Sequence, residues 1–534
     1  MPSMLTRLMT VEVVIVALVL VVPLVLVLYL YVFDRRQRQH SILRSYPILG
    51  RLRYLFESMG PEMRQYFFDE DNDGEPFSRV EFTEVVKSSK YLERLIGFGS
   101  KRDFDAPGFY LRNSMFPTLA RDMRYDRTAG VETRRYVTDS EGLFTRHEHT
   151  VEVRENPWLL EEEDAVVIGP RCEHPFRVRG LVGMSAMSYG SLGDHAIRAL
   201  SAGLGMAGGS WMNTGEGGLS PHHLSGGVDV ICQIGPGKFG YRTTDGAFSF
   251  DELRKKAQIP QVKAFELKLA QGAKIRGGHL PGPKVTLEIA AIRGLEPWKD
   301  VDSPNRFEEF SDVRGLVEFI EQIRDATGKP VGCKVVMGDR SSLDELAAWM
   351  AESGKGPDFI TVDGGEGGSG ATYSELADSV GLPIASALII VDDTLRRAGV
   401  RDRVTLIASG KLLTPDRQAI ALGMGADLVN VARGFMISVG CIGAQRCHTN
   451  RCPVGVATTD PRFQQALVVE EKKYRAANFV MASRHGLYTI AAALGLTSPT
   501  QIRREHVVYR DDRGRVHNLT EWYPYPAAEQ FQQL

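Results

Sequence analysis

The first strong pattern in the chain is an apolar run over residues 11–33, in which Glu12 is the only charged residue. Its length of about 23 residues is enough to span a hydrocarbon core of ~30 Å. A cleavable signal peptide is the alternative, but this run exceeds the roughly 7–15 apolar residues of such a peptide, and no small-residue cleavage site follows it. The pattern therefore predicts a membrane anchor.

Basic residues are distributed unevenly around the apolar run. Arg7 precedes it, whereas Arg35, Arg36, Arg38 and Arg44 crowd its C-terminal side. Because positively charged flanks stay on the cytoplasmic side of a membrane, we predict a single-pass protein whose body lies in the cytoplasm. The anchor and its basic flank make up residues 1–45.

An extension at residues 46–160 follows, rich in Arg, Phe, Tyr and acidic residues and without a repeated strand signal. We expect it to be partly helical and to pack on the main domain. From about residue 165 the pattern changes to short β-branched runs that end in glycine-rich loops, each followed by a helical stretch. The predicted strands are 179–185, 209–214, 228–234, 264–269, 330–336, 358–362, 404–408 and 427–432. The predicted helices include 194–206, 316–326, 342–352 and 415–422.

This alternation predicts an α/β fold with a parallel sheet. About eight such units, with functional loops at the strand ends, predict a closed (β/α)8 TIM barrel over residues 161–470. An open, doubly wound sheet is the alternative if the strand count is wrong. Residues 471–534 are predicted to form a C-terminal tail that begins with a helix at 472–494.

Composition narrows the classes of partner. Hydrophobic content of 43% and charged content of 24% are ordinary for a globular enzyme. The formal net charge of -2 gives no electrostatic footprint for nucleic acid, so we exclude that partner. The 54 glycines fall in short clusters at predicted strand ends, which favours loops that cradle a ligand.

Three glycine-rich loops, 363–370, 409–411 and 432–434, follow the last predicted strands. In barrels of this kind such loops commonly hold a phosphate on backbone N–H groups, and Arg433 or Lys411 could neutralise its charge. Plain tight turns are the alternative for each loop taken singly. Together the loops predict a phosphorylated cofactor. Lys334 lies within a buried β run and therefore needs an anionic partner, for which a flavin ring edge is one candidate and a Schiff-base role is the rival.

A basic loop over residues 266–279 places several cations near one strand end, and Arg293 follows a little later. Bases clustered over a barrel mouth favour a dicarboxylate or keto acid ligand. A solvated surface loop is the alternative.

Three of the six cysteines lie close together, with the spacing C-x5-C-x4-C followed by Pro453. They are Cys441, Cys447 and Cys452. Soft thiolate ligands suit an iron–sulfur cluster, a zinc ion that would also need His448, or a structural thiol group. The spacing alone favours an iron–sulfur cluster but leaves all three kinds of site open.

Five segments appear in the same order as in the FMN and iron–sulfur domain of the glutamate synthase large subunit. They are 183–192 (GMSAMSYGSL), 213–218 (NTGEGG), 266–274, 363–370 and 441–458 (CIGAQRCHTNRCPVGVAT). Over roughly residues 165–460 the chain resembles this family. The resemblance implies a TIM barrel with FMN and a [3Fe-4S] cluster, in which 2-oxoglutarate and ammonia form 2-iminoglutarate that reduced flavin converts to L-glutamate.

The resemblance also implies roles for individual residues. Cys441, Cys447 and Cys452 resemble the cluster ligands. The expected cofactor-binding residues are Ser185, Ala186, Met187, Ser188, Gln233, Lys334, Gly367, Gly368, Gly410, Ala432 and Arg433. The expected catalytic residues are Glu216, Lys274 and Lys334, and the expected substrate-binding residues are Lys274, Arg276, His279 and Arg293. His279 replaces a glutamine of the family and Arg276 is an added charge, which leaves the identity of the oxo acid open.

The 534 residues include no segment that resembles the family's amidotransferase or glycine-repeat domains, so ammonia is expected to arrive free or from a separate glutaminase. The electron donor is expected to be ferredoxin-like, a reductase subunit or quinone-linked. An amine-glutamate synthase of the N-methylglutamate type is one alternative function. A membrane redox module or sensor that makes no glutamate is the other.

Overall fold

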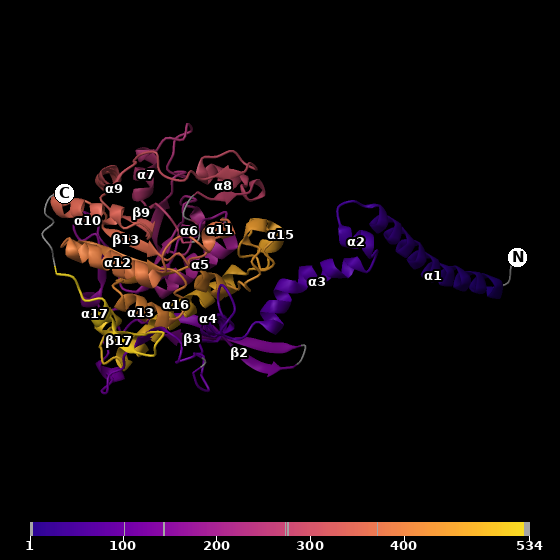
Figure 1. Ribbon diagram of the computed structural model, residues 1–534, viewed down its shortest axis with the longest axis horizontal. Coiled ribbons are helices and arrows are strands. Elements are labelled where there is room, and N and C mark those ends of the chain that lie inside the picture. The colour runs from indigo at the N-terminus through magenta and orange to yellow at the C-terminus, as the bar shows by residue number, and fades with distance from the viewer. Residues whose placement is uncertain are drawn as a thin grey trace. The chain divides into compact units, whose positions relative to one another are not determined.

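The computed structural model describes residues 4–100, 102–142, 145–272, 274, 277–370 and 372–527 of the 534-residue chain. The chain divides into two compact units, Met1–Arg79 and Val80–Leu534 (Figure 1). The N-terminal unit contains three α-helices and a π-helical turn. Their bounds are α1 (Met4–Arg36), α2 (Ser41–Ser45), α3 (Gly50–Met63) and η1 (Arg64–Phe68).

Helix α1 contains the apolar run. Its segment Ile15–Arg36, 22 residues with a mean hydropathy of 3.0, is long and apolar enough to cross a membrane, and its apolar part is not buried within the chain. Length and composition are the only grounds for this statement, and a signal sequence near the N-terminus shares both properties. The anchor expected at residues 11–33 therefore stays a prediction.

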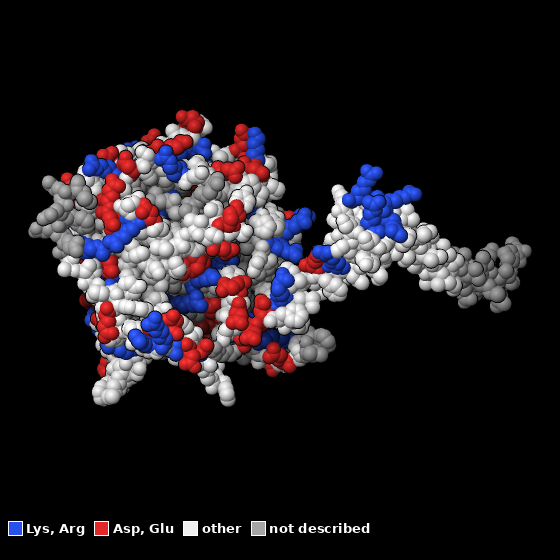
Figure 2. Space-filling view, viewed as in Figure 1, with Lys and Arg blue, Asp and Glu red and all other residues white. Residues whose placement is uncertain are grey.

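An ion pair fixes the turn that follows α1. The buried carboxylate of Asp34 accepts hydrogen bonds from the guanidinium of Arg51 at 2.5 and 3.0 Å and from the backbone N–H of Ile48 at 2.9 Å. These bonds tie the end of α1 to the start of α3. In Figure 2 basic side chains gather near this turn, where four exposed arginines lie: Arg35, Arg36, Arg38 and Arg44.

The second unit is built on a closed barrel of eight parallel strands, in the order β6-β7-β8-β9-β12-β13-β14-β15, with β15 pairing back to β6. The strands are β6 (Val182–Met184), β7 (Trp211–Asn213), β8 (Asp229–Ile234), β9 (Val262–Lys268), β12 (Val331–Val336), β13 (Phe359–Asp363), β14 (Thr405–Ser409) and β15 (Leu428–Val431). Every predicted strand overlaps one of these eight, so the α/β barrel is confirmed. Closure excludes the open, doubly wound sheet.

Helices follow the strands around the barrel (Figure 1). They are α5 (Asp194–Ala207), α6 (Pro221–Leu224), α7 (Phe250–Ala257), α8 (Leu287–Arg293), α9 (Val313–Thr327), α10 (Ser341–Ser353), α11 (Ser374–Ala377), α12 (Ile384–Arg397), α13 (Pro415–Gly423) and α14 (Arg433–Ser438). The ends of α9 show why the predicted helices formed. The side chain of Asp312 accepts a hydrogen bond from the N–H of Gly315 at 2.8 Å, and Gly328, with φ of +68°, ends the helix.

The segments before and after the barrel pack together. Strand β1 (Gly108–Leu111) pairs with β16 (Val507–Arg510), which pairs with β17 (Val516–Asn518). Helix α16 (Val469–Ala493) packs against α5 and α13. Further elements of this unit include α4 (Arg79–Tyr91), β4 (Val166–Ile168), β5 (Phe176–Val178), β10 (His279–Leu280), β11 (Val301–Asp302), α15 (Pro461–Gln464) and α17 (Leu519–Trp522).

A long hairpin in the extension differs from the sequence expectation. Strands β2 (Val131–Glu141) and β3 (Arg146–Glu155) pair antiparallel, where no strand signal was recognised. Most of their side chains are exposed or half-buried, and Thr133 is the one described as buried. A ribbon that is largely polar on both faces lacks the alternation of apolar and polar residues by which strands are recognised.

Candidate functional site

The three glycine loops meet at the C-terminal ends of β13, β14 and β15. The N–H of Gly364 donates to the carbonyl of Ser409 at 2.8 Å, and a Cβ at Gly410 would lie 3.1 Å from the nitrogen of Gly364. Gly410 has φ of +134°, a conformation that side-chain-bearing residues rarely adopt. Because the backbones of these loops approach each other closely, main-chain groups rather than side chains line the surface at this edge.

Arg433 adds a positive charge to these loops. A Cβ at Gly368 would lie 2.6 Å from Nη2 of Arg433, so the guanidinium rests directly on that glycine. The Gln271 amide donates to the carbonyl of Gly368 at 3.0 Å and joins the basic loop to this edge. Glycine backbone beside an arginine is an arrangement that suits an anion such as a phosphate. The structure thus brings together Gly367, Gly368, Gly410, Ala432 and Arg433.

Lys334, buried in β12, has an anionic partner inside the protein. Its Nζ lies 3.0 Å from Oδ2 of Asp363, the last residue of β13, and both side chains are almost fully buried. The same Oδ2 accepts the N–H of Gly272 at 2.9 Å. The sequence predicted that Lys334 needs a negative partner but did not identify Asp363, because the pairing arises from the alignment of two neighbouring strands.

A buried network centres on Glu266 of β9. Its carboxylate accepts hydrogen bonds from the amides of Asn213 at 2.8 Å and Gln233 at 2.6 Å, and from the hydroxyl of Thr361 at 2.5 Å. These bonds fix the Gln233 amide with its nitrogen toward Glu266. The Gln233 Oε1 is buried and has no partner among the described residues. A buried acceptor without a donor is expected to have one supplied by a ligand.

The segment after β6 lies beside this network. The N–H of Ser185 donates to the carbonyl of Val431 at 3.0 Å, and the N–H of Met187 donates to the carbonyl of Asn213 at 3.4 Å. The hydroxyl of Ser188 accepts the N–H of Gly217 at 3.2 Å. Ser185, Ala186, Met187 and Ser188 therefore lie at the same end of the barrel as the glycine loops.

Glu216, in the loop after β7, lies between two lysines. The Nζ atoms of Lys268 and Lys274 both donate to its Oε1 at 2.7 Å, and all three side chains are largely buried. Burial raises the pKa of Glu216, but the two ammonium groups outweigh burial and hold it well below its usual value. Burial lowers the pKa of Lys268 to about 8, while Glu216 acts in the opposite direction.

Lys268 was not assigned a role of its own from the sequence. It ends β9 two residues after Glu266, so strand alternation directs both side chains to the same side of the sheet. The alternation of side chains along β9 is the signal by which Lys268 could have been recognised as a residue of the site.

Arg293, at the end of α8, lies near Glu216. Its side chain is 4% exposed, donates to the carbonyl of Tyr189 at 2.9 Å and lies 5.5 Å from the ring centre of Phe239. A Cβ at Gly217 would lie 2.7 Å from Nη2 of Arg293. Burial lowers the pKa of Arg293 to about 10, and the Glu216 charge opposes this shift.

Of the two remaining predicted substrate residues, His279 is not brought to this group. His279 lies on β10 with its ring 2.9 Å from Asp302, and its side chain is 44% exposed. Arg276 lies outside the residues that the structure describes.

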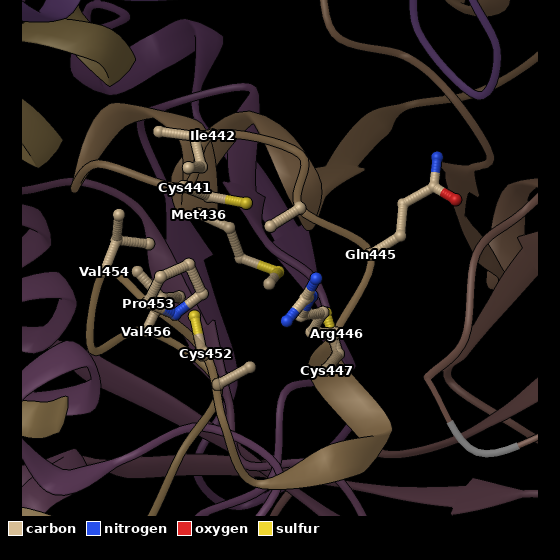
Figure 3. A pocket seen from close by; sticks show the side chains of 12 residues that line it. Met436, Cys441, Ile442, Gln445, Arg446, Cys447, Cys452, Pro453, Val454 and Val456 are labelled. Atoms are coloured by element: carbon tan, nitrogen blue, oxygen red, sulfur yellow. The ribbon is translucent and has the colours of Figure 1, made fainter. Parts of the chain in front are cut away.

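The three clustered cysteines line one small pocket together with Met436, Arg446 and Pro453. Figure 3 shows the sulfurs of Cys441 and Cys452 and the Met436 thioether turned into this pocket, whereas Gln445 points away. Burial raises the pKa of the Cys441 thiol to about 11, and the charges of Cys447 and Cys452 act in the same direction.

Within the described part of the chain, no three His, Cys, Asp or Glu side chains converge closely enough to hold a metal ion. The cysteine segment nevertheless adjoins the glycine loops. A Cβ at Gly370 would lie 3.1 Å from the Cβ of Cys447. The cysteine pocket and the candidate anion site are therefore neighbours.

Comparison with known proteins adds the family to this geometry. A family model described as a conserved region in glutamate synthase matches residues 120–497. The chain is 56% identical over 487 residues to the glutamate synthase large subunit-like protein YerD of Bacillus subtilis (strain 168), across 91% of this chain and 93% of that protein. It is 32% identical over 368 residues to the archaeal-type glutamate synthase (NADPH) of Thermotoga maritima, 68% of either chain. The chain therefore belongs to the glutamate synthase family.

Proposed function

We propose that this protein is a glutamate synthase-like flavoprotein oxidoreductase that reduces 2-iminoglutarate, formed from 2-oxoglutarate and ammonia, to L-glutamate. The observation that carries the proposal is the buried group of Glu216, Lys268 and Lys274, with Arg293 beside it, at the barrel end where the glycine loops meet. Buried cations at a barrel mouth suit a ligand with two carboxylates. Relatives whose names include glutamate synthase support the proposal of this reaction.

FMN is the proposed resident cofactor, and the residues present fit it. Glycine backbone and Arg433 suit its phosphate, and the unpartnered Oε1 of Gln233 offers an acceptor for a ring N–H. The phosphate would be held by Gly367, Gly368, Gly410, Ala432 and Arg433. The ring would be contacted by Ser185, Ala186, Met187, Ser188, Gln233 and Lys334. When bound, FMN supplies the hydride that reduces the imine.

A [3Fe-4S] cluster is the proposed second group, held by Cys441, Cys447 and Cys452. Three cysteine thiols that line one pocket are the soft ligands that an iron–sulfur cluster takes. Contact between Cys447 and Gly370 would keep this group next to the FMN phosphate loops. When bound, the cluster supplies electrons one at a time.

The protein's own residues bind the substrate and handle its protons. Glu216 stays ionised because two ammonium groups lie on Oε1, so it can orient Lys268 and Lys274 toward a carboxylate. Nζ of Lys268, with a pKa of about 8, holds a proton that it can give up near neutral pH. Lys334 is fixed by Asp363 and would lie beside the flavin ring edge.

A reoxidation assay tests this function. Purified full-length protein, chemically reduced without oxygen, is mixed with 2-oxoglutarate and ammonium. We expect the absorbance of oxidised flavin to return and L-glutamate to form, whereas neither substrate alone produces the change. Methylamine giving N-methylglutamate in place of ammonium would favour the amine-glutamate synthase. Absence of reoxidation with any pair of amine and oxo acid would leave the membrane redox module.

Residues 11–33 are proposed to anchor the protein in a membrane, with the body in the cytoplasm. The exposed apolar surface of α1 and the arginines that follow it support this location. Electrons would come from a ferredoxin-like protein, a reductase subunit or a quinone-linked partner. Ammonia would come free or from a separate glutaminase.

A further inference from the structure

Lys284 is a buried lysine whose ammonium group donates to backbone carbonyls. It ends the 3-10 turn η4 (Gly282–Lys284) between β9 and α8, and 3% of its surface is exposed. Its Nζ donates to the carbonyl oxygens of Cys447 at 2.8 Å, Ser191 at 3.3 Å and Ala457 at 3.3 Å. Within the described ranges, no Asp or Glu forms an ion pair with this ammonium group.

A buried ammonium group is costly unless an opposite charge lies close to it. Of the three carbonyl acceptors of Lys284, the nearest is that of Cys447, one of the three clustered cysteines. Carbonyl dipoles satisfy the donors but do not neutralise the charge. A cluster bound by three thiolates is anionic, so the cysteine pocket is where a counter-charge for Lys284 would lie.

The hydrogen bonds of Lys284 also connect three separate segments. Ser191 belongs to the loop after β6 that contains Ser185 and Ser188, Cys447 is one of the clustered cysteines, and Ala457 follows the last of them. One side chain thus fixes the cysteine segment relative to the loop expected to contact the flavin ring.

We propose that Lys284 is the counter-cation and positioning residue of the cysteine site, and that its charge raises the reduction potential of the cluster held there. This inference rests on the proposed [3Fe-4S] cluster. Thiolates and cluster together carry negative charge, which increases by one on reduction. A fixed positive charge nearby stabilises the more negative, reduced form over the oxidised form.

Four variants of the full-length protein test the proposal. Lys284→Met removes both charge and donor, Lys284→Gln removes the charge but keeps an N–H donor, and Lys284→Arg keeps the charge. Lys329→Met is the matched control, because Lys329 is also buried and donates to the carbonyls of Ala257 and Val262, away from the clustered cysteines. Iron, sulfide and FMN contents are measured, and the cluster midpoint potential is determined by a redox titration followed by electron paramagnetic resonance.

We expect the midpoint of Lys284→Met and Lys284→Gln to move to lower potential, with FMN content unchanged and with faster iron loss to a chelator. Lys284→Arg and Lys329→Met should keep the wild-type midpoint. If Lys284→Met does not fold, Lys284→Gln decides, since it retains hydrogen bonding. If Lys284→Gln and wild type had equal midpoint potentials, the proposed role of Lys284 would be wrong, while the proposed cluster would stand. A wild-type protein without iron would overturn the proposed cluster and this role together.

Discussion

At the scale of single residues, Glu216 holds two lysines on one carboxylate oxygen at the mouth of the barrel. Loss of either lysine removes a charge-assisted hydrogen bond, an interaction worth about 1.5–3 kcal/mol. The remaining lysine still neutralises Glu216, so the fold is expected to survive the substitution.

Lys274→Met is therefore expected to raise the KM for 2-oxoglutarate about tenfold or more, since about 1.4 kcal/mol corresponds to a factor of ten. The FMN spectrum should not change. Steady-state kinetics in the glutamate assay measure the effect. Lys255→Met, on the exposed face of α7, serves as the control and should behave as wild type. An unchanged KM in Lys274→Met would remove this residue from the substrate site.

The stability of the folded protein depends on pH through His223. It is fully buried, with Nδ1 2.7 Å from the hydroxyl of Ser220, and burial lowers its pKa from 6.5 to about 4. The unfolded chain therefore takes up the proton first as pH falls. Its contribution to stability is complete above about pH 6.5 and is lost between 6.5 and 4.

We expect His223 to make the folded protein about 2 kcal/mol less stable at pH 5 than at pH 7. His223→Gln should flatten this dependence while lowering stability at pH 8, as shown by thermal unfolding at several pH values. Part of the slope should persist, because burial also lowers the pKa of His485 to about 4. His174→Gln, on the surface, should keep the wild-type slope. If the stability of His223→Gln fell as steeply with decreasing pH as that of wild type, His223 would not be the source of this pH dependence.

At the scale of elements, helix α16 joins the extension to the barrel through one buried amide. The side chain of Asn478 donates to the carbonyls of Ser89 in α4 at 3.0 Å and Arg134 in β2 at 2.8 Å, and accepts the hydroxyl of Thr133 at 2.7 Å. These bonds connect α4, β2 and α16. The hairpin that the sequence pattern missed is anchored here by its one buried residue, Thr133.

Asn478→Leu should leave two carbonyls and a hydroxyl buried without partners and lower the stability of the barrel unit by about 2–4 kcal/mol. Chemical denaturation followed by circular dichroism measures this loss. Asn113→Ala, at an exposed position, provides the comparison and should change stability little. A loss below about 0.5 kcal/mol would show that the amide does not join these elements.

At the scale of the whole molecule, the exposed apolar helix α1 is the basis of the proposed membrane location. A spanning anchor predicts that the intact chain sediments with membranes and resists extraction by alkaline carbonate. Mass spectrometry of the N-terminus distinguishes this result from cleavage. A soluble protein that begins after residue 33 would identify the apolar run as a removed signal sequence.

The barrel was predictable because its pattern is local. Strands buried on both faces appear as continuous β-branched runs, and glycines mark the turns that follow them, so all eight strands were recognised. The β2–β3 hairpin was missed because neither of its faces is continuously apolar. The pairing of β1 with β16 joins segments about 400 residues apart, which no local pattern indicates.

The sequence by itself determined the eight barrel units, the glycine loops, the spacing of the cysteines and the apolar N-terminal run, since each depends on neighbours along the chain. Only the tertiary structure decided the partners of buried charges. Lys334 meets Asp363, Lys268 shares Glu216 with Lys274, and Lys284 lies against the cysteine segment. The reason is physical: a buried charge is stabilised by whatever the fold brings near it, and closure of the barrel fixes that neighbour.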